Sequence, residues 1–162
     1  MKNKFLNGKK IPALFLSLLF TAVLIGSCNK DDEDTNNNQP YNISGNANGT
    51  QVVPSNAATG TGTITGTFDP TTNTLTYTST WTGLSGAPSS AGFYAGASGV
   101  AGTVVGEPWV LDTTMTTDGT VSSSVVLTAD QASQLLAGNM YYSYYTATYP
   151  GGEIRGQITA TR

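Results

Sequence analysis

Histidine is absent from this 162-residue sequence, and cysteine occurs once, at Cys28. Without histidine the chain cannot form a Ser-His-Asp triad, a Cys-His pair or an imidazole metal site. A single cysteine cannot form a disulfide within the chain. These absences predict a protein that is not an enzyme, with no catalytic residues, no metal site and no cofactor.

Charged residues are also scarce, at 10% of the chain against roughly 25% in an average soluble domain. From Cys28 onward there are ten acidic and three basic residues, a net charge of −7. A surface of that sign repels phosphates, so we expect no nucleic-acid partner. Thr, Ser, Gly, Asn and Tyr take the place of helix-forming residues, and this composition favours strands.

The first 27 residues have the three parts of an export signal. Basic Lys2–Lys10 precedes an apolar stretch, Ile11–Ile25, whose 15 or so residues fall short of the roughly 20 that a transmembrane helix needs. Ile25-Gly26-Ser27-Cys28 resembles the bacterial lipobox, which implies cleavage before Cys28 and acylation of its thiol and new amino terminus. The alternative is a free cysteine after a plain signal peptide or membrane anchor. We predict a signal peptide over 1–27 and a lipidated Cys28 that anchors the protein to a membrane.

Residues 28–40 predict a disordered tether, because Asn29–Pro40 contains no apolar side chain that could pack in a core. Its acidic run, Asp31–Asp34, resembles the surface-export signal of lipoproteins in the Bacteroidetes. That resemblance implies a lipid-anchored protein of the outer membrane that is exposed at the cell surface. The alternative is a solvated spacer on a lipoprotein that faces the periplasm.

The remaining residues, 41–162, predict one all-β domain. Thr alternates with apolar residues over 61–68 and 74–81, which is typical of half-buried strands, and the turn residues of 69–73 join these two strands in a hairpin. The glycines of 83–106 predict a long irregular stretch.

Two further turn signals predict two further hairpins. Asp118-Gly119 separates the expected strands 109–116 and 120–127. Pro150-Gly151-Gly152 separates 140–148 from 153–161.

One short helix is expected near residues 129–137. Thr128 and Gln131 are spaced as a capping box, and Gly138 can end the helix with a positive φ. Short turns between strands then favour an antiparallel β-sandwich of Greek-key or immunoglobulin-like type.

The order of motifs resembles the CHRD domain, named for chordin and common in bacterial secreted proteins. The resemblance covers residues 43–160, and its most specific part is the closing segment Tyr149-Pro150-Gly151-Gly152-Glu153-Ile154-Arg155-Gly156-Gln157-Ile158. It implies a β-domain in an extracellular setting, without a settled molecular activity. Members of this family usually carry histidines, candidate metal ligands, where this sequence has Gly92, Tyr94 and Tyr145.

Tyrosines concentrate at 141, 142, 144, 145 and 149, on both faces of an expected strand. Both faces of a strand in a two-layer domain cannot be equally buried, so some rings should be partly exposed. We predict Tyr142, Tyr144 and Tyr94 as contacts for an extracellular glycan or protein ligand. The alternative is aromatic pairing across strands that only stabilises the sheet.

Glu153 and Arg155 share one face of their expected strand, alternating with Ile154, which we expect in the core. A structural ion pair or a clamp on a loop is the simpler interpretation of this pair, and a ligand contact is the other. Arg155 is the sole basic residue between Lys30 and Arg162, so any anion site would have to use it.

Taken together, the sequence predicts a non-catalytic surface lipoprotein whose β-sandwich is a binding or structural module. The alternative from another class is a degenerate metal-handling or enzymatic domain that lacks the histidines of the family. That alternative requires converging carboxylates, or Tyr94 and Tyr145 beside an acid.

Overall fold

The computed structural model describes residues 38–112 and 114–162. The expected signal peptide, Cys28 and most of the tether lie outside these residues. No helix within them is long and apolar enough to cross a membrane. The elements are β1 (Tyr41–Asn48), the 3-10 helix η1 (Gly49–Gln51), β2 (Thr61–Asp69), β3 (Thr74–Thr82), β4 (Pro88–Ala95), β5 (Thr103–Val105), β6 (Gly119–Val126), α1 (Ala129–Leu136), β7 (Met140–Thr146), β8 (Ile154–Gln157) and β9 (Thr159–Thr161).

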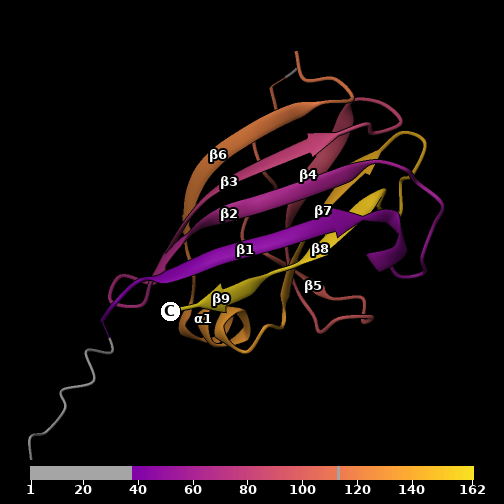
Figure 1. The fold of residues 1–162 in the computed structure, drawn as a ribbon. Coiled ribbons are helices and arrows are strands. Elements are labelled where there is room, and N and C mark those ends of the chain that lie inside the picture. Colours follow the sequence, from indigo (N-terminus) through magenta and orange to yellow (C-terminus); the bar gives the residue numbers. More distant parts are fainter. Residues whose placement is uncertain (1–37, 113) are drawn as a thin grey trace, which may run out of the picture. The chain divides into compact units, whose positions relative to one another are not determined.

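The strands form one antiparallel sheet in the order β5-β4-β7-β8-β1-β2-β3-β6, with β9 also paired to β1. The sheet curls, so that β1, β2, β3 and β6 form a layer in front of β4 and β7 (Figure 1). The two layers join where Asn48 of β1 pairs with Arg155 of β8. The predicted all-β class with antiparallel strands and one short helix is confirmed, and its two layers are halves of a single curled sheet.

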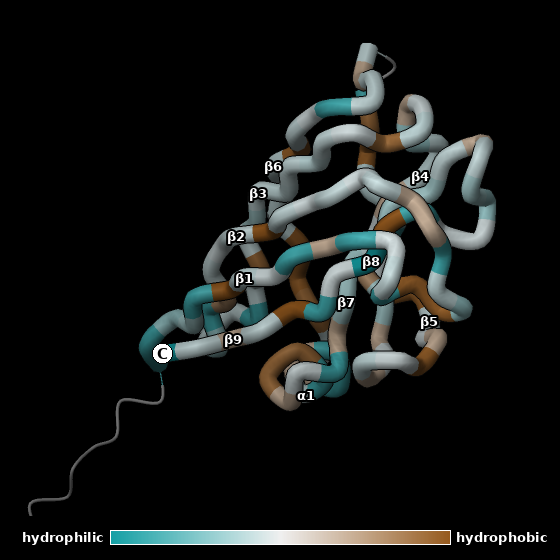
Figure 2. The backbone as a smooth tube through the Cα atoms, turned by 45° about the vertical axis from the view of Figure 1, so that its right-hand side comes forward, coloured by the Kyte–Doolittle hydropathy of each residue, from teal (hydrophilic) through white to brown (hydrophobic). Residues whose placement is uncertain are grey.

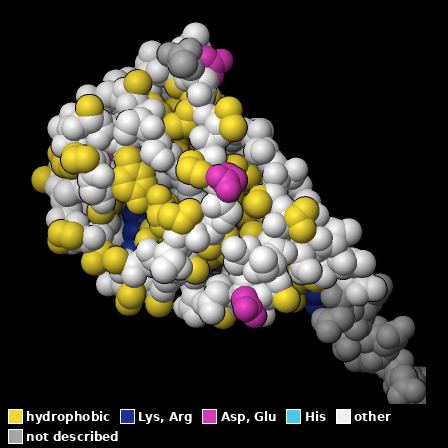
Figure 3. Space-filling view, turned by 180° about the vertical axis from the view of Figure 1, so that it is seen from behind, with side chains coloured by type: hydrophobic (Ala, Val, Ile, Leu, Met, Phe, Trp, Pro, Cys, Tyr) yellow, Lys and Arg dark blue, Asp and Glu magenta, His cyan; other side chains and the backbone are white. Residues whose placement is uncertain are grey.

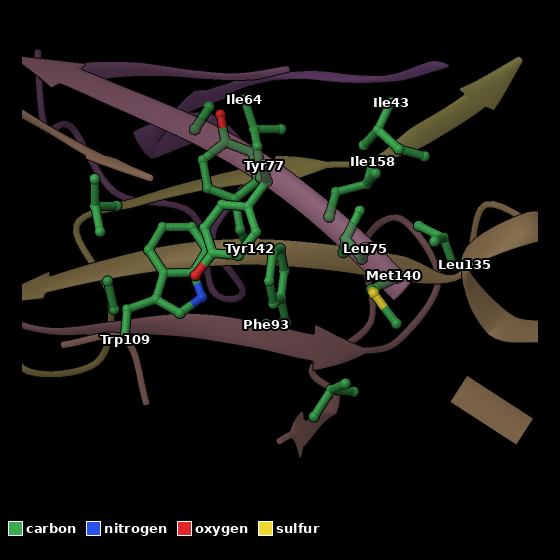
Figure 4. Close-up of a cluster of buried hydrophobic side chains, with 14 of the residues drawn as sticks. Ile43, Ile64, Leu75, Tyr77, Phe93, Trp109, Leu135, Met140, Tyr142 and Ile158 are labelled. Atoms are coloured by element: carbon green, nitrogen blue, oxygen red, sulfur yellow. The ribbon is translucent and has the colours of Figure 1, made fainter. Parts of the chain in front are cut away.

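Side chains from both layers fill the space between them (Figure 4). Tyr77 of β3 meets Phe93 of β4 edge-on with ring centroids 4.8 Å apart, and Trp81 of β3 lies 4.9 Å from Tyr144 of β7. Along the strands, apolar residues appear as short segments separated by polar ones (Figure 2), as expected where every second side chain faces a core.

Local signals place the first hairpin and the helix as predicted. Asp69 accepts the backbone N–H of Thr71 at 2.8 Å, and Asn73 takes a positive φ of 54° in the turn between β2 and β3. The side chains and backbones of Thr128 and Gln131 form both bonds of a capping box at the start of α1. The hairpin of β7 and β8 is also present.

Two local predictions are wrong. The glycine-rich stretch 83–106 contains β4 and β5. The small residues Ser89–Gly92 of β4 show no alternation between a polar and an apolar face, so no strand was expected there. Residues 109–112 and 114–116 do not form a strand, and β6 pairs with β3 instead of with them. The expected turn residue Asp118 accepts the backbone N–H of Gly83 at 2.9 Å, so it holds a distant loop and makes no hairpin.

Candidate binding site

Tyr142 and Tyr144 lie in the core, each with 0% of its surface exposed. Their hydroxyls donate to partners in the opposite layer, Tyr142 to the Gly45 carbonyl oxygen at 3.3 Å and Tyr144 to Ser79 Oγ at 2.7 Å. The prediction that these two rings contact an external ligand is therefore wrong. The reason is that the inner face of β7 lies against the other layer, where a phenol is tolerated once its hydroxyl has a partner.

The third predicted tyrosine, Tyr94, lies on the outer face of the same layer beside two rings of β7. It pairs directly with Tyr141, and the two rings stack with centroids 5.2 Å and planes 15° apart. Tyr145 lies 6.0 Å away, tilted by 54°. Burial, reinforced by a hydrogen bond to Tyr145, raises the pKa of the Tyr94 phenol. This is the cross-strand aromatic pairing that the sequence offered as an alternative to ligand contact.

Arg155 reaches this outer tyrosine cluster from β8. Its guanidinium carbon lies 3.5 Å from the centroid of the Tyr141 ring, a cation–π contact. Its N–H groups donate to the carbonyl oxygens of Val100 and Ala97, both at 2.8 Å, and to Gln157 Oε1 at 3.1 Å. Arg155 thus clamps the loop between β4 and β5 onto the sheet.

A small pocket of about 140 Å³ opens among these residues. We call it the tyrosine–arginine pocket; side chains of Tyr94, Tyr141, Ser143, Tyr145 and Arg155 line it, together with the loop at residues 101–102. Seen from behind, the molecule shows a hollow with a basic side chain at its bottom and hydrophobic side chains around it (Figure 3). Guanidinium, phenol and ring surfaces in one place can bind a polar group and stack on a ring.

Glu153, the remaining predicted site residue, is buried away from this pocket. Its carboxylate accepts the backbone N–H and the hydroxyl of Ser85, both at 2.7 Å, and the hydroxyl of Thr146 at 2.5 Å. It therefore fastens the loop before β4, as Arg155 fastens the loop after it. Among the described residues, neither side chain pairs with the other, and the loop-clamp interpretation fits both.

A second, larger cavity of about 430 Å³ was not anticipated from the sequence. Tyr77, Phe93 and Trp109 line its apolar side, and Ser122–Ser124 of the edge strand β6 line its polar side. The indole nitrogen Nε1 of Trp109 is buried and has no acceptor in the described part of the chain. Trp109 follows β5 in the chain but packs across the core, and no local pattern indicates that.

Comparison with known proteins identifies the family. The sequence matches the family model of the CHRD domain over residues 43–158. The chain belongs to the CHRD domain family. No curated protein and no solved structure matches it significantly. The matched range runs from β1 to the end of β8, so the tyrosine–arginine pocket lies wholly inside the CHRD domain.

Of the three positions where the sequence resemblance expects histidine, two line the pocket in this CHRD domain and the third does not. Tyr94 and Tyr145 line the tyrosine–arginine pocket. Gly92 pairs with Ser143 on the same sheet, and a side chain added there would meet only Pro108, at 3.8 Å. Within residues 38–112 and 114–162, no three His, Cys, Asp or Glu side chains come together as metal ligands would.

Proposed function

We propose that this protein is a lipoprotein anchored through Cys28 in the bacterial outer membrane, where its CHRD domain binds an extracellular ligand in the tyrosine–arginine pocket. The single observation that carries the binding role is the grouping of Tyr94, Tyr145 and Arg155 around one hollow on the outer face of the sheet. Half-exposed tyrosines over a cation suit the recognition of polar, ring-bearing molecules. The lipobox-like sequence and acidic tether support the location.

Protease treatment of intact cells tests the location. We expect the domain to be cleaved from whole cells, and the peptide that begins at Cys28 to carry acyl mass. A Cys28→Ala variant should lose both the acyl mass and the membrane association. Protection of the domain until the outer membrane is broken would instead place it in the periplasm.

A matched pair of tyrosine variants tests the binding role. Tyr94→Ala should abolish the binding of any extracellular glycan or protein that the full chain captures. Tyr149→Ala removes a half-buried tyrosine outside the pocket and should leave binding unchanged. Equal binding by both variants would mean that the tyrosine–arginine pocket does not bind the ligand.

A purely structural role is the second candidate, and the stacking of Tyr94 on Tyr141 favours it. In that case Tyr94→Ala would lower the free energy of unfolding while no external ligand bound the wild-type protein. Thermal unfolding of Tyr94→Ala beside wild type, together with the binding assay above, separates the two roles.

A further inference from the structure

The positive charge of Arg155 has no negative partner among the described residues. Every acceptor that it binds is neutral: two backbone carbonyls, the Gln157 amide oxygen and the face of the Tyr141 ring. The acidic residue nearest to it in the sequence is Glu153, whose carboxylate accepts hydrogen bonds from Ser85 and Thr146 and makes none with Arg155. Only 3% of Arg155 is exposed. A buried charge without a counter-charge is costly, so an anion that enters the pocket gains more here than at an open surface.

Arg155 also retains the donors to bind such an anion. A guanidinium has five N–H groups, and acceptors among the described residues take three of them. The two that remain are Nε–H and one Nη1–H. Because both hydrogens of Nη2 are engaged, a carboxylate oxygen accepts a single charge-assisted hydrogen bond here and not a bidentate pair. The pocket of about 140 Å³ is small beside the roughly 300–1,000 Å³ of sites that enclose whole ligands, so it admits a group and not an entire molecule.

The tyrosine rings beside Arg155 indicate which kind of molecule would bear the carboxylate that enters the pocket. Tyr94 and Tyr145 are each part exposed at the pocket, where a flat apolar surface can stack on a sugar ring and a phenol can bond to its hydroxyls. We propose that the tyrosine–arginine pocket binds the carboxylate of a uronic acid residue in an extracellular polysaccharide, with Arg155 as counter-charge and Tyr94 and Tyr145 against the sugar ring. This inference rests on the proposed binding function and names its ligand class.

The net negative charge of the domain affects which anions the pocket should select. Residues 38–112 and 114–162 hold six acidic residues and two basic ones, Arg155 and Arg162, a net charge of −4. Such a surface repels densely charged polyanions, while a single carboxylate beside a sugar ring reaches Arg155 with little repulsion.

NMR titration of the purified full chain in mild detergent tests this proposal, with the Ala101 and Gly102 amides as reporters in the pocket. Sodium glucuronate should shift both signals, and neutral glucose should bind about tenfold more weakly or worse, since it lacks a charge-assisted bond. Sodium acetate supplies the carboxylate without the ring and should also bind more weakly than glucuronate.

A charge-swap variant provides the matched control. Ala101 is exposed at the pocket, so neither Ala101→Asp nor Ala101→Asn should unfold the domain. Ala101→Asp places a carboxylate at the pocket that holds Arg155 and should weaken glucuronate binding far more than Ala101→Asn, which has the same shape without the charge; the Gly102 amide reports binding in both variants.

Three results would overturn the inference: equal binding of glucose and glucuronate, equal binding of acetate and glucuronate, or equal loss of binding in Ala101→Asp and Ala101→Asn. None of these contradicts the proposed function, which depends on surface location and on the Tyr94→Ala result with any extracellular ligand. Conversely, a domain that binds glucuronate but stays protected in intact cells would refute the proposed location and leave this chemistry intact.

Discussion

The two faces of β7 place the same residue type in opposite settings. On the inner face, Tyr142 and Tyr144 are fully buried, and each hydroxyl donates to one fixed acceptor across the core. On the outer face, Tyr141 and Tyr145 contact Tyr94, and the Tyr141 ring carries the guanidinium of Arg155. The inner rings stabilise the fold, while the outer rings form the wall of a pocket. Residue type alone therefore does not indicate function on this strand; what lies opposite each face does.

The largest expected effect is unfolding of the domain at alkaline pH, driven by the inner phenols. Burial raises the pKa of Tyr77 from its ordinary value of 10 to about 12, and burial also raises the pKa values of Tyr142 and Tyr144. The folded state holds these protons more tightly than the unfolded state does. Their contribution to stability is therefore complete below pH 10 and is lost as the pH rises from 10 through the folded-state values.

A spectroscopic titration checks this. Phenolate absorbance from the inner tyrosines should appear together with the loss of far-ultraviolet circular dichroism above pH 10. Ionisation of every tyrosine near pH 10 with the fold intact would contradict the buried assignment.

Truncating one ring on each face gives the next largest contrast. Tyr144→Ala should lower the free energy of unfolding by about 3–5 kcal/mol, because it leaves a cavity beside Trp81. Tyr145→Ala, on the half-exposed outer face, should cost no more than about 1.5 kcal/mol. Urea denaturation of both variants measures the difference, and similar costs would erase the distinction between the faces.

Glu153→Gln tests how much the loop clamps contribute. The buried carboxylate accepts three hydrogen bonds, and neutralising it weakens charge-assisted bonds to Ser85 and Thr146. We expect the free energy of unfolding to fall by about 1–3 kcal/mol. Glu107→Gln changes an exposed carboxylate and serves as the control, with no measurable change expected in the same denaturation assay.

Removing one hydroxyl from an inner ring should have the smallest effect. Tyr144→Phe keeps the ring and loses the 2.7 Å bond to Ser79 Oγ, while Ser79 still donates to the Thr63 carbonyl oxygen. The expected cost is about 1 kcal/mol in chemical denaturation. A cost near that of Tyr144→Ala would mean that the hydroxyl, and not the ring, holds this part of the core.

Sequence patterns predicted those parts of the fold in which one face is polar and the other apolar. The Thr-rich faces of β2 and β3 and the capping box of α1 are local signals, so the sequence alone was sufficient to predict these two strands and this helix. In β4, by contrast, Ala91, Gly92 and Ser90 are small on both faces and give no period. The dipeptide Asp118-Gly119 looked like a hairpin turn. Asp118 instead accepts a hydrogen bond from the backbone of Gly83, 35 residues earlier, and no local pattern could indicate that contact.

The candidate site was predictable in composition but not in geometry. The spacing of Glu153 and Arg155 around Ile154 put both on one face, and both do clamp loops. Their partners, Ser85 for Glu153 and Ala97 and Val100 for Arg155, lie 55 to 68 residues away, beyond any local pattern. Because β7 carries tyrosine on both faces, the sequence could not tell which pair faced the core, and Tyr142 and Tyr144 were assigned wrongly.

The pairing of β1 with β9 has a consequence for how the chain folds. β1 is the first strand of the domain to be synthesised, yet Asn42–Ser44 pair with Thr159–Thr161, at the far end of the sequence. Such a long loop must close before this edge of β1 is paired, which slows folding and leaves that one edge open to aggregation in the meantime, while the other edge can already pair with β2. The sheet is therefore completed only once the three-residue strand β9 has been synthesised, although β1, β2 and β3 can pair as hairpins before that.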